Sequence, residues 1–551
     1  MKKWAKLGMM CVLAMSFTLA GCTSGGDKKG DQKAGETPKQ ETKQEAPKKV
    51  QDTLIVGRGG DSASLDPSIV TDGESIKIAQ QVFDKLLEYK PGTTEVQAGL
   101  AESWKVSSDG LQYTFTLRKG VKFHDGTDFN ADAVVFNFNR WSDPKSPYKF
   151  QGDSFDYYTS MFGADDKRVI KEVKAIDPNT VQFTLNKPSA PFLQNVAMPA
   201  FSIGSPKAIQ EKKEKFKSEP VGTGPFVFKE WKRNDSITLE KNPNYWKQGL
   251  PKLNKVIVRA IPDNSARFTA LQNGELDLIE GINADDLKTL EGNKNLQKVI
   301  RPSFNVGYFG FVTTKKPFDD PKVRVALSYA VNKKAIISAF FGGLAEPATN
   351  PMPPSLWGYN KDVQDYPYDL EKAKSLLKEA GYPNGLPGEY VFYAMPVSRP
   401  YMQDAKKVAE AIQADFAKIG VKTKISSPEW ATYLDDVKKG EKDDLFLLGW
   451  TGDNGDPDNF LYNQLDKDNI GGNNRSRYSN DEVHSLLIEA QSATDKAKRE
   501  DLYKKAQVIM KKDAPWIPLV HSTPLLGAKA NVAGFVPSPT GSEAYTEVYF
   551  K

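Results

Sequence analysis

The sequence predicts an α/β protein that has a parallel sheet and more than one hydrophobic core. The order of the predicted elements supports the first point, and the length of the chain supports the second. Residues 389–448 alternate apolar strand-like runs with amphipathic helical runs, in the order strand, helix, strand, helix, strand. Strands joined through helices in this way pair in parallel. The chain has 551 residues, and a single hydrophobic core stops growing near ~250–300 residues, so more than one core is expected.

The first half of the chain predicts strands and helices in alternation. Residues 54–56 form an apolar strand, and a helix over 76–86 places apolar residues on one face. Apolar and polar side chains alternate over 113–117, which is typical of a half-buried strand. Another helix begins at Asn130 or Asp132, because both residue types cap helices.

The second half predicts a longer series of elements. Asp320 and Asp369 stand where helix caps are expected, and Gly381 and Gly420 stand where helices end. The expected helices cover 323–341, 370–380, 404–419, 433–437 and 497–511, and the expected strands cover 389–394, 421–425 and 445–448.

The N-terminus predicts export and attachment to a membrane. Three lysines precede an apolar run over 7–19, which is too short to span ~30 Å of hydrocarbon. Small residues then precede Cys22, as in the signal of a bacterial lipoprotein. Residues 22–51 are polar and charged, so they cannot bury enough surface to fold and are expected to form a disordered tether. Several acyl chains on Cys22 would anchor the protein stably.

Charge and composition exclude several classes of function. The chain carries a net charge of +5, and residues 1–51 hold ten lysines and five acids, so the remainder is near neutral. A neutral body has no basic field that would attract nucleic acid. The chain has two cysteines, both within the first 22 residues, and three scattered histidines. This inventory predicts neither a metal site nor a cofactor site.

An acidic, glycine-rich loop follows the apolar strand that begins at Leu445. Trp450, Gly452 and Asp453 bring an aromatic face, bare backbone and a carboxylate to the carboxyl end of this strand. Ligands of open α/β sheets bind at such ends, so the combination favours a ligand that carries a cation. The alternatives are an ordinary polar turn and a calcium loop, but the spacing of the acids does not fit a calcium loop.

Several segments identify a family. AESW at 101–104 and YTFTLRKGVKFHDG at 113–126 resemble the signature region of the extracytoplasmic solute-binding proteins that serve peptide and nickel ABC importers. The resemblance continues through VGTGPF, NPNYW and NVGY, which begin at Val221, Asn242 and Asn305, and it covers the chain from residue 54 to its end.

The resemblance implies a two-lobed, periplasmic-binding-protein-like fold of the large three-subdomain type, with ligand enclosed between hinged lobes. It implies a first lobe over 52–304 with an inserted subdomain near 90–200, a second lobe over 305–523 and a return to the first lobe over 524–551. The implied partners are a short peptide and a membrane-embedded ABC permease with its ATPase subunits, and the protein is expected to be a monomer.

Within the family, the closest resemblance is to dipeptide-binding lipoproteins. MPVSRPY at 395–401 and GWTGDNGDPDNF at 449–460 match their motifs. The resemblance therefore implies that Arg399 binds the peptide carboxylate and that Asp453 binds the peptide ammonium. A zwitterion needs both partners, because an unpaired charge is costly to bury. Four further residues in matching contexts are expected to line the pocket: Tyr401, Trp430, Trp450 and Gly452.

The residues present also bear on other functions. An enzyme such as a peptidase is not expected, because the chain lacks HExxH, GxSxG and a cysteine–histidine pair. His124 lies in a turn beside Asp125, with no second histidine nearby, and is expected to be structural. Longer oligopeptides, haem, nickel and oligosaccharides are alternative ligands within the family. A peptide-sensing receptor is a further alternative that the sequence does not separate from a transport protein.

Overall fold

The predicted parallel sheet is present in the computed structural model, which describes residues 51–551. β15 (Glu389–Tyr393) pairs in parallel with both β16 (Lys422–Ser426) and β17 (Leu445–Thr451). The helices α11 (Ala405–Ala417) and α12 (Trp430–Lys439) connect these strands, as the hydrophobic periodicity predicts. The predicted α/β class is therefore confirmed.

The predicted signal peptide, Cys22 and the tether up to residue 50 lie outside the described residues. Within residues 51–551, no helix is both long enough and apolar enough to cross a membrane. The expected lipid anchor therefore stays a prediction.

A seven-stranded sheet organises the first lobe. β1 is central and pairs in parallel with β10 and β11, whereas β9 and β19 pair with their neighbours in the antiparallel sense. The strand order is β12 (Leu296–Ile300), β19 (Leu525–Lys529), β11 (Leu278–Glu280), β1 (Thr53–Arg58), β10 (Lys255–Ala260), β9 (Ser236–Lys241) and β8 (Phe226–Lys232).

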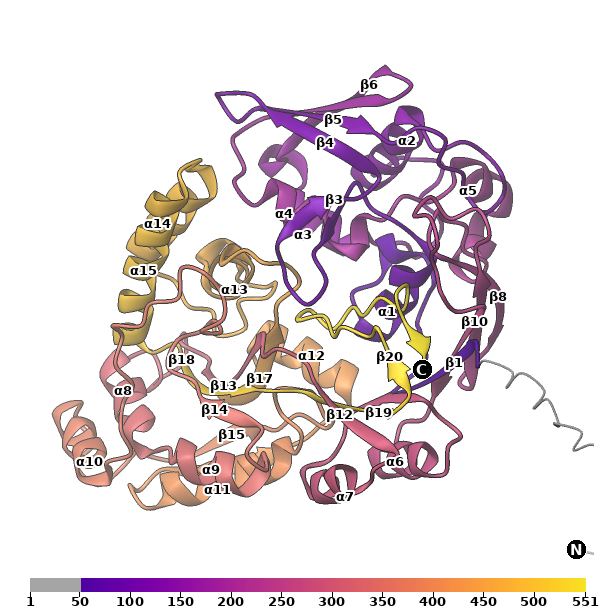
Figure 1. Cartoon of the computed structure of the whole chain (residues 1–551). Helices are drawn as coiled ribbons and strands as arrows, with labels where there is room; N and C mark the ends of the chain where they lie inside the picture. The colour runs from indigo at the N-terminus through magenta and orange to yellow at the C-terminus, as the bar shows by residue number, and fades with distance from the viewer. Residues whose placement is uncertain (1–50) are drawn as a thin grey trace, which may run out of the picture. The chain divides into compact units, whose positions relative to one another are not determined.

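Smaller elements and seven helices complete this lobe (Figure 1). A four-stranded antiparallel sheet has the order β4 (Ala101–Val106), β5 (Gln112–Leu117), β7 (Thr180–Leu185) and β6 (Ile170–Asp177). The short strands are β2 (Leu87–Tyr89), β3 (Val96–Ala98), β20 (Val532–Ala533) and β21 (Tyr549–Phe550). The helices are α1 (Gly73–Val82), α2 (Ala131–Ser142), α3 (Asp156–Phe162), α4 (Phe192–Val196), α5 (Pro206–Lys212), α6 (Asn264–Gln272) and α7 (Leu287–Gly292).

A six-stranded sheet organises the second lobe. Its strand order is β14 (Ala345–Pro347), β18 (Trp516–Ser522), β13 (Asn305–Phe311), β17, β15 and β16. β13 is buried along its whole length and pairs in the antiparallel sense with both neighbours, so this sheet is mixed rather than wholly parallel. The remaining helices are α8 (Pro321–Ala330), α9 (Lys333–Phe340), α10 (Leu370–Glu379), α13 (Asp458–Leu465), α14 (Asp481–Ser492) and α15 (Lys496–Asp513).

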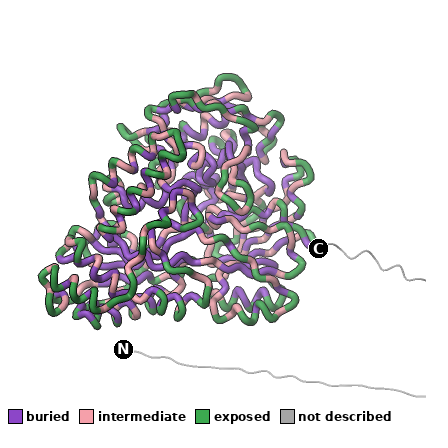
Figure 2. Tube along the Cα trace, turned by 60° about the vertical axis from the view of Figure 1, so that its left-hand side comes forward, coloured by how far each residue is buried: buried purple, intermediate pink, exposed green. Residues whose placement is uncertain are grey.

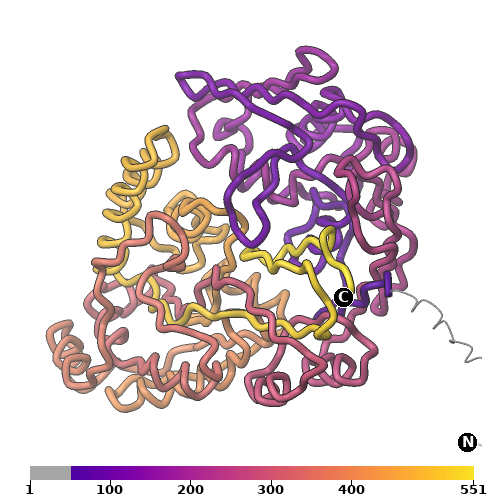
Figure 3. Tube along the Cα trace, in the orientation of Figure 1, coloured from indigo at the N-terminus to yellow at the C-terminus, as the bar shows by residue number. Residues whose placement is uncertain are grey.

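Each lobe has its own buried core, and the chain passes twice between the two large sheets (Figures 2 and 3). The first crossing, residues 301–304, leads from β12 to β13, and the second, residues 523–524, leads from β18 to β19. The crossings lie together, because the backbone N–H of Arg301 donates to the carbonyl of Pro524 at 3.0 Å.

The predicted helix over 323–341 is wrong, because two helices occupy this segment. α8 ends at Ala330, and Val331 is extended. The side chain of Asn332 then accepts a hydrogen bond from the N–H of Ala335 and caps α9. Asparagine competes for backbone donors in this way, so it favours a helix start over a helix interior.

The predicted helix over 76–86 is too long, since α1 ends at Val82. Phe83 is extended, and the N–H of Gly224 donates to the carbonyl of Val82 at 3.0 Å. A β-carbon at Gly222 or Gly224 would overlap with residues 82–83, so only glycine allows this approach. A segment 140 residues away thus ends the helix, which local periodicity cannot predict.

Asp443 is a buried carboxylate, and replacing it should stabilise the protein. It has no exposed surface, and neither carboxylate oxygen has a hydrogen-bond partner among residues 51–551. Burial raises the pKa of Asp443 to about 6, above its unfolded value of about 3.8. This group therefore stabilises the fold most below pH ~4, and that contribution is lost as the pH rises through 6.

We expect Asp443→Asn to raise the free energy of unfolding by about 2 kcal/mol at pH 7.5 and to have little effect at pH 4. Urea denaturation at both pH values measures this difference. Asp444→Asn is the matched control, because the Asp444 carboxylate accepts from the N–H of Val391 at 2.8 Å and lies 3.3 Å from Lys315 Nζ. The control should destabilise the fold. An Asp443→Asn variant that is no more stable at pH 7.5 would contradict the interpretation.

Candidate functional site

The loop after β17 is fixed at the first crossing. Thr451 pairs with Asn305, and the N–H of Gly452 donates to the carbonyl of Phe304 at 3.0 Å. A β-carbon at Gly452 would overlap with the ring of Phe304, so the loop can lie this close only because residue 452 is glycine. The backbone therefore sets the position of Asp453.

The Asp453 carboxylate is held by side chains from both lobes. Oδ1 accepts a hydrogen bond from the Tyr157 hydroxyl on α3 at 2.7 Å. Oδ2 accepts from Asn459 Nδ2 on α13 at 3.0 Å. These donors are neutral, and Asp453 forms no ion pair within residues 51–551. Because each oxygen can accept a second hydrogen bond, the carboxylate keeps acceptor capacity for a cation.

Burial sets the protonation of this carboxylate. It raises the pKa of Asp453 to about 6, while the hydrogen bonds from Asn459 and Tyr157 act in the opposite direction. Asp453 is therefore mostly ionised at pH 7, although it lacks a positive partner. A buried charge without a partner is costly, so a cationic group brought to Asp453 would gain affinity.

The other two acids of the loop have partners within the second lobe. Asp456 is buried and lies 2.7 Å from Arg499 Nη2, and it also accepts from the N–H of Asp458 at 3.0 Å. Asp458 accepts from Gln491 Nε2 at 3.0 Å. Burial and the neighbouring Asp456 raise the pKa of Asp458 to about 7. These contacts give both acids structural roles.

Arg399 follows β15 in a tight turn. Its backbone N–H and carbonyl both bond to Met402, at 3.0 and 2.9 Å. The carbonyl of Pro400 accepts from the Ser522 hydroxyl at 2.7 Å, which fastens the turn to the second crossing. Within residues 51–551 the guanidinium of Arg399 pairs with no carboxylate, so Arg399 forms no structural salt bridge there. It stacks over Trp430, 5.0 Å from the ring centre.

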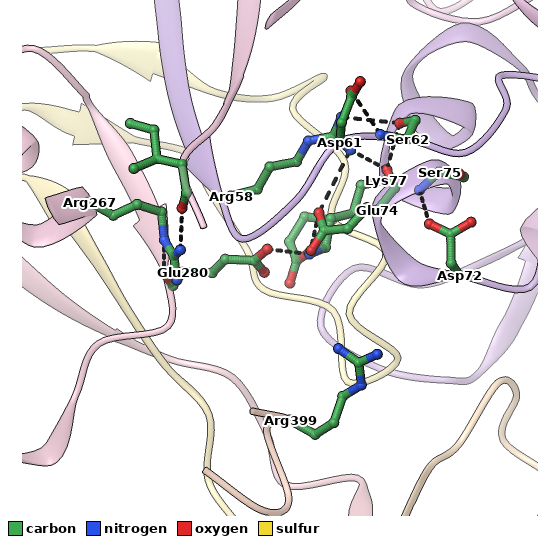
Figure 4. Close-up of polar contacts among 12 residues, drawn as sticks. Arg58, Asp61, Ser62, Asp72, Glu74, Ser75, Lys77, Arg267, Glu280 and Arg399 are labelled. Carbon is green, nitrogen blue, oxygen red and sulfur yellow. Dashed lines mark hydrogen bonds and ion pairs between the residues drawn. The ribbon is translucent and has the colours of Figure 1, made fainter. Parts of the chain in front are cut away.

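Acidic side chains of the first lobe are engaged with other cations (Figure 4). Glu74 lies 3.7 Å from Arg58 Nη1 and 3.5 Å from Lys77 Nζ, and Lys77 also pairs with Glu280. Figure 4 draws Arg399 without any such contact. The guanidinium therefore remains available for an anion.

The other predicted pocket residues lie at the same edge of the second sheet. Tyr401 is buried, and its ring covers Gly449, where a β-carbon would overlap with it. Trp430 stacks on Tyr433 with ring centres 5.4 Å apart. Trp450 Nε1 donates to Asn459 Oδ1 at 3.0 Å. The two motifs thus follow the neighbouring parallel strands β15 and β17, which places Arg399 and Asp453 at one sheet edge.

Two residues of this region were not predicted. Tyr157 lies 296 positions from Asp453 in sequence, and no local motif marks it. Asn459 lies within the quoted motif, but nothing in the sequence showed that its amide touches both Asp453 and Trp450. Nearby, Asn454 Nδ2 donates to Asn195 Oδ1 at 2.9 Å, so a second buried contact joins the loop to the first lobe.

The histidines have structural surroundings. His124 Nε2 lies 3.0 Å from the carbonyl of Gly224, and burial lowers the pKa of His124 to about 4, as expected for a structural residue. The fold also groups Asp466, Asp468 and His484, whose donor atoms lie within 4.8 Å of one another. The sequence did not predict this group. Asp466 bonds to His484 at 3.0 Å, and Asp468 lies 3.4 Å from Lys167, so internal contacts account for it.

Known proteins share this architecture and sequence. Residues 95–472 match the family model of bacterial extracellular solute-binding proteins, family 5 middle. Heme-binding protein A of Haemophilus influenzae is 43% identical over 514 residues, covering 91% of this chain and 93% of that protein. The dipeptide-binding protein of Escherichia coli is 41% identical over 510 residues, covering 90% and 94%.

A solved structure extends the likeness to the fold. The ABC transporter-associated periplasmic binding protein DppA from Helicobacter pylori, in complex with the peptide STSA, superposes with a TM-score of 0.81. It is 38% identical to this chain and covers 91% of it and 98% of its own length. The predicted two-lobed fold is thereby confirmed, and the chain belongs to the bacterial extracellular solute-binding proteins of family 5.

Proposed function

We propose that this protein captures short peptides, dipeptides above all, and delivers them to an ABC permease. One observation carries the proposal: Asp453 and Arg399 follow neighbouring parallel strands, and within residues 51–551 Asp453 pairs with no cation and Arg399 with no anion. A zwitterionic peptide supplies both missing charges. The Arg399 fork can bond a carboxylate bidentately, and the free lone pairs of Asp453 can accept an ammonium.

Contacts around Asp453 favour a free peptide N-terminus. Tyr157 and Asn459 occupy one position on each carboxylate oxygen, and the Asn454–Asn195 pair is buried beside them. An acyl group on the peptide nitrogen would remove its charge and would need space in this region. We therefore expect the ammonium end to be specified strictly.

A haem-binding function is less well supported, although one relative carries that name. Haem offers carboxylates for Arg399 but no ammonium for Asp453. The imidazoles of His124 and His521 are buried against backbone carbonyls, and His484 is bonded to Asp466. A peptide satisfies both unpaired charges and is favoured for that reason.

We also propose the location of the protein, its attachment to the membrane and the boundaries of its lobes. We propose that the protein is exported, is attached through a lipid on Cys22 to the outer face of the cytoplasmic membrane, and binds its ligand rather than converting it. The lipoprotein-like N-terminal sequence supports the attachment, and the family supports export and binding. We propose lobe boundaries at 52–304, 305–523 and 524–551, because the buried side chains of each core fall within these ranges except Phe304, which lies in the first crossing and packs in the core of the second lobe.

Isothermal titration with three ligands tests the proposed function: alanyl-leucine, its N-acetyl form and its C-terminal amide. We expect the free dipeptide to bind and each blocked form to lose at least 100-fold in affinity, because each leaves one protein charge unpaired. Equal binding of the acetylated and free forms would refute the role of Asp453. Binding of hemin with no binding of dipeptides would refute the peptide proposal.

A further inference from the structure

We infer that Asn459 is the positioning residue that orients Asp453 for a peptide ammonium, an inference that rests on the proposed function. Asn459 lies in the first turn of α13 and is only 3% exposed. Its Oδ1 accepts from the backbone N–H of Asp453 and from Trp450 Nε1, both at 3.0 Å. Its Nδ2 donates to Asp453 Oδ2, also at 3.0 Å.

These three contacts require an amide. One end of the side chain must accept two N–H donors while the other end donates to a carboxylate. The same contacts fix the orientation of the amide, since the reversed orientation would point Nδ2 at two donors. Aspartate lacks the donor and adds a like charge, and leucine lacks both functions. Asparagine is therefore the side chain that the site needs.

Asn459 can hold Asp453 before the lobes meet. Asn459 and Asp453 are six residues apart on the same lobe, whereas Tyr157 approaches from α3 of the first lobe. The Asn459 contact therefore does not depend on closure, and the Tyr157 contact does. We therefore infer that Asn459 orients the Asp453 carboxylate before the lobes close, and that Tyr157 helps to enclose it afterwards.

The Asn459 amide also links the Asp453 carboxylate to the indole of Trp450. Asn459 Oδ1 is shared by the backbone of Asp453 and the indole of Trp450. Losing Asn459 would leave the partly buried indole N–H without this acceptor and free the Asp453 carboxylate to rotate. Binding should therefore fall although the ligand need not touch Asn459 itself.

The protonation of Asp453 distinguishes positioning from general support of the fold. The Asn459 donor stabilises the ionised carboxylate, so its loss should raise the pKa of Asp453 above about 6. The titratable groups facing Asp453 are Tyr157 on α3 and Tyr89 on β2, and both have a pKa raised well above 10.0 by burial. Asp456 on the loop is held by Arg499. Neither tyrosine should titrate between pH 5 and 8. Asp458, five residues further along the chain, has a pKa that burial raises to about 7, so a residue-specific NMR signal is needed to follow Asp453 alone.

The test compares Asn459→Leu and Asn459→Asp with the wild-type protein. The affinity for alanyl-leucine is measured by titration from pH 5 to 8, and carbon-13 NMR follows the Asp453 carboxyl group without ligand. We expect each variant to lose at least 30-fold in affinity at pH 7 and to shift the midpoint of Asp453 upward by at least half a pH unit. Asn463→Leu is the control, because Asn463 is equally buried on the same helix. It should change neither quantity.

Two results would overturn the inference. Weaker binding with an unchanged Asp453 midpoint in both variants would show that Asn459 only supports the fold. Wild-type affinity in either folded variant would show that it is not needed. If the wild-type protein binds no dipeptide, the proposed function fails, but the NMR midpoint still reports whether Asn459 controls Asp453. Aspartate is nearly isosteric with asparagine, so Asn459→Asp keeps the test open if the leucine variant does not fold.

Discussion

Asp453→Asn should lower the affinity for alanyl-leucine by about 1,000-fold. Removing one partner of an enclosed, hydrogen-bonded charge pair costs roughly 3–5 kcal/mol, since the peptide ammonium is then enclosed without a counter-charge. Tyr157 and Asn459 remain as neutral neighbours and cannot replace the lost charge. Isothermal titration at pH 7.5 measures the change.

The same variant should be more stable without ligand. The folded pKa of Asp453 is raised to about 6, so its ionisation disfavours the fold as the pH rises from 4 through 6. Thermal unfolding at pH 7.5 should therefore give a higher midpoint for Asp453→Asn.

By the same linkage, wild-type affinity for alanyl-leucine should fall about tenfold from pH 7 to pH 5, whereas the affinity of the variant should lack this dependence. Unchanged affinity in Asp453→Asn would refute the assignment.

Arg399→Gln should lower the affinity for alanyl-leucine by about 100-fold. Glutamine can donate one hydrogen bond to the peptide carboxylate but supplies neither a charge nor a bidentate fork. The loss should be smaller than for Asp453, because Arg399 is partly exposed and water can solvate an unpaired carboxylate. The variant should show no further loss with the C-terminal amide, since that ligand has no carboxylate to bind.

Arg233→Gln is a matched control for Arg399. Arg233 also stacks on a tryptophan, with its guanidinium carbon 3.3 Å from the centre of the Trp231 ring, but it lies on the first lobe away from both motifs. This variant should bind both ligands as the wild-type protein does. If Arg399→Gln weakens the amide and the free dipeptide equally, Arg399 does not act as the carboxylate partner.

Local patterns were sufficient for most of the second lobe. The apolar periods of 389–448 predicted the parallel strands and their helices, and the structure confirms them. The two motifs also placed Arg399 and Asp453 after neighbouring strands. These predictions succeed because strand ends, caps and turns depend on residues close in sequence.

Long-range packing accounts for what the sequence could not predict. The Gly222–Gly224 segment ends α1 at Val82, although the helical pattern continues beyond that residue. Tyr157 reaches Asp453 across 296 positions through the tertiary fold alone. The ionisation of Asp453 likewise depends on burial, which local sequence does not encode.

The two crossings between the sheets have a mechanical consequence. The Asp453 loop is hydrogen-bonded to Phe304 and the Arg399 turn to Ser522, so both charged groups lie beside the crossings. Tyr157 instead lies on α3 of the other lobe. Points near a rotation axis travel little, and distant points travel far. Opening the lobes about the crossings would therefore withdraw Tyr157 while Arg399 and Asp453 keep their spacing. A peptide could then bind to both charged groups on the open protein. Closure would lower its dissociation rate rather than change its association rate.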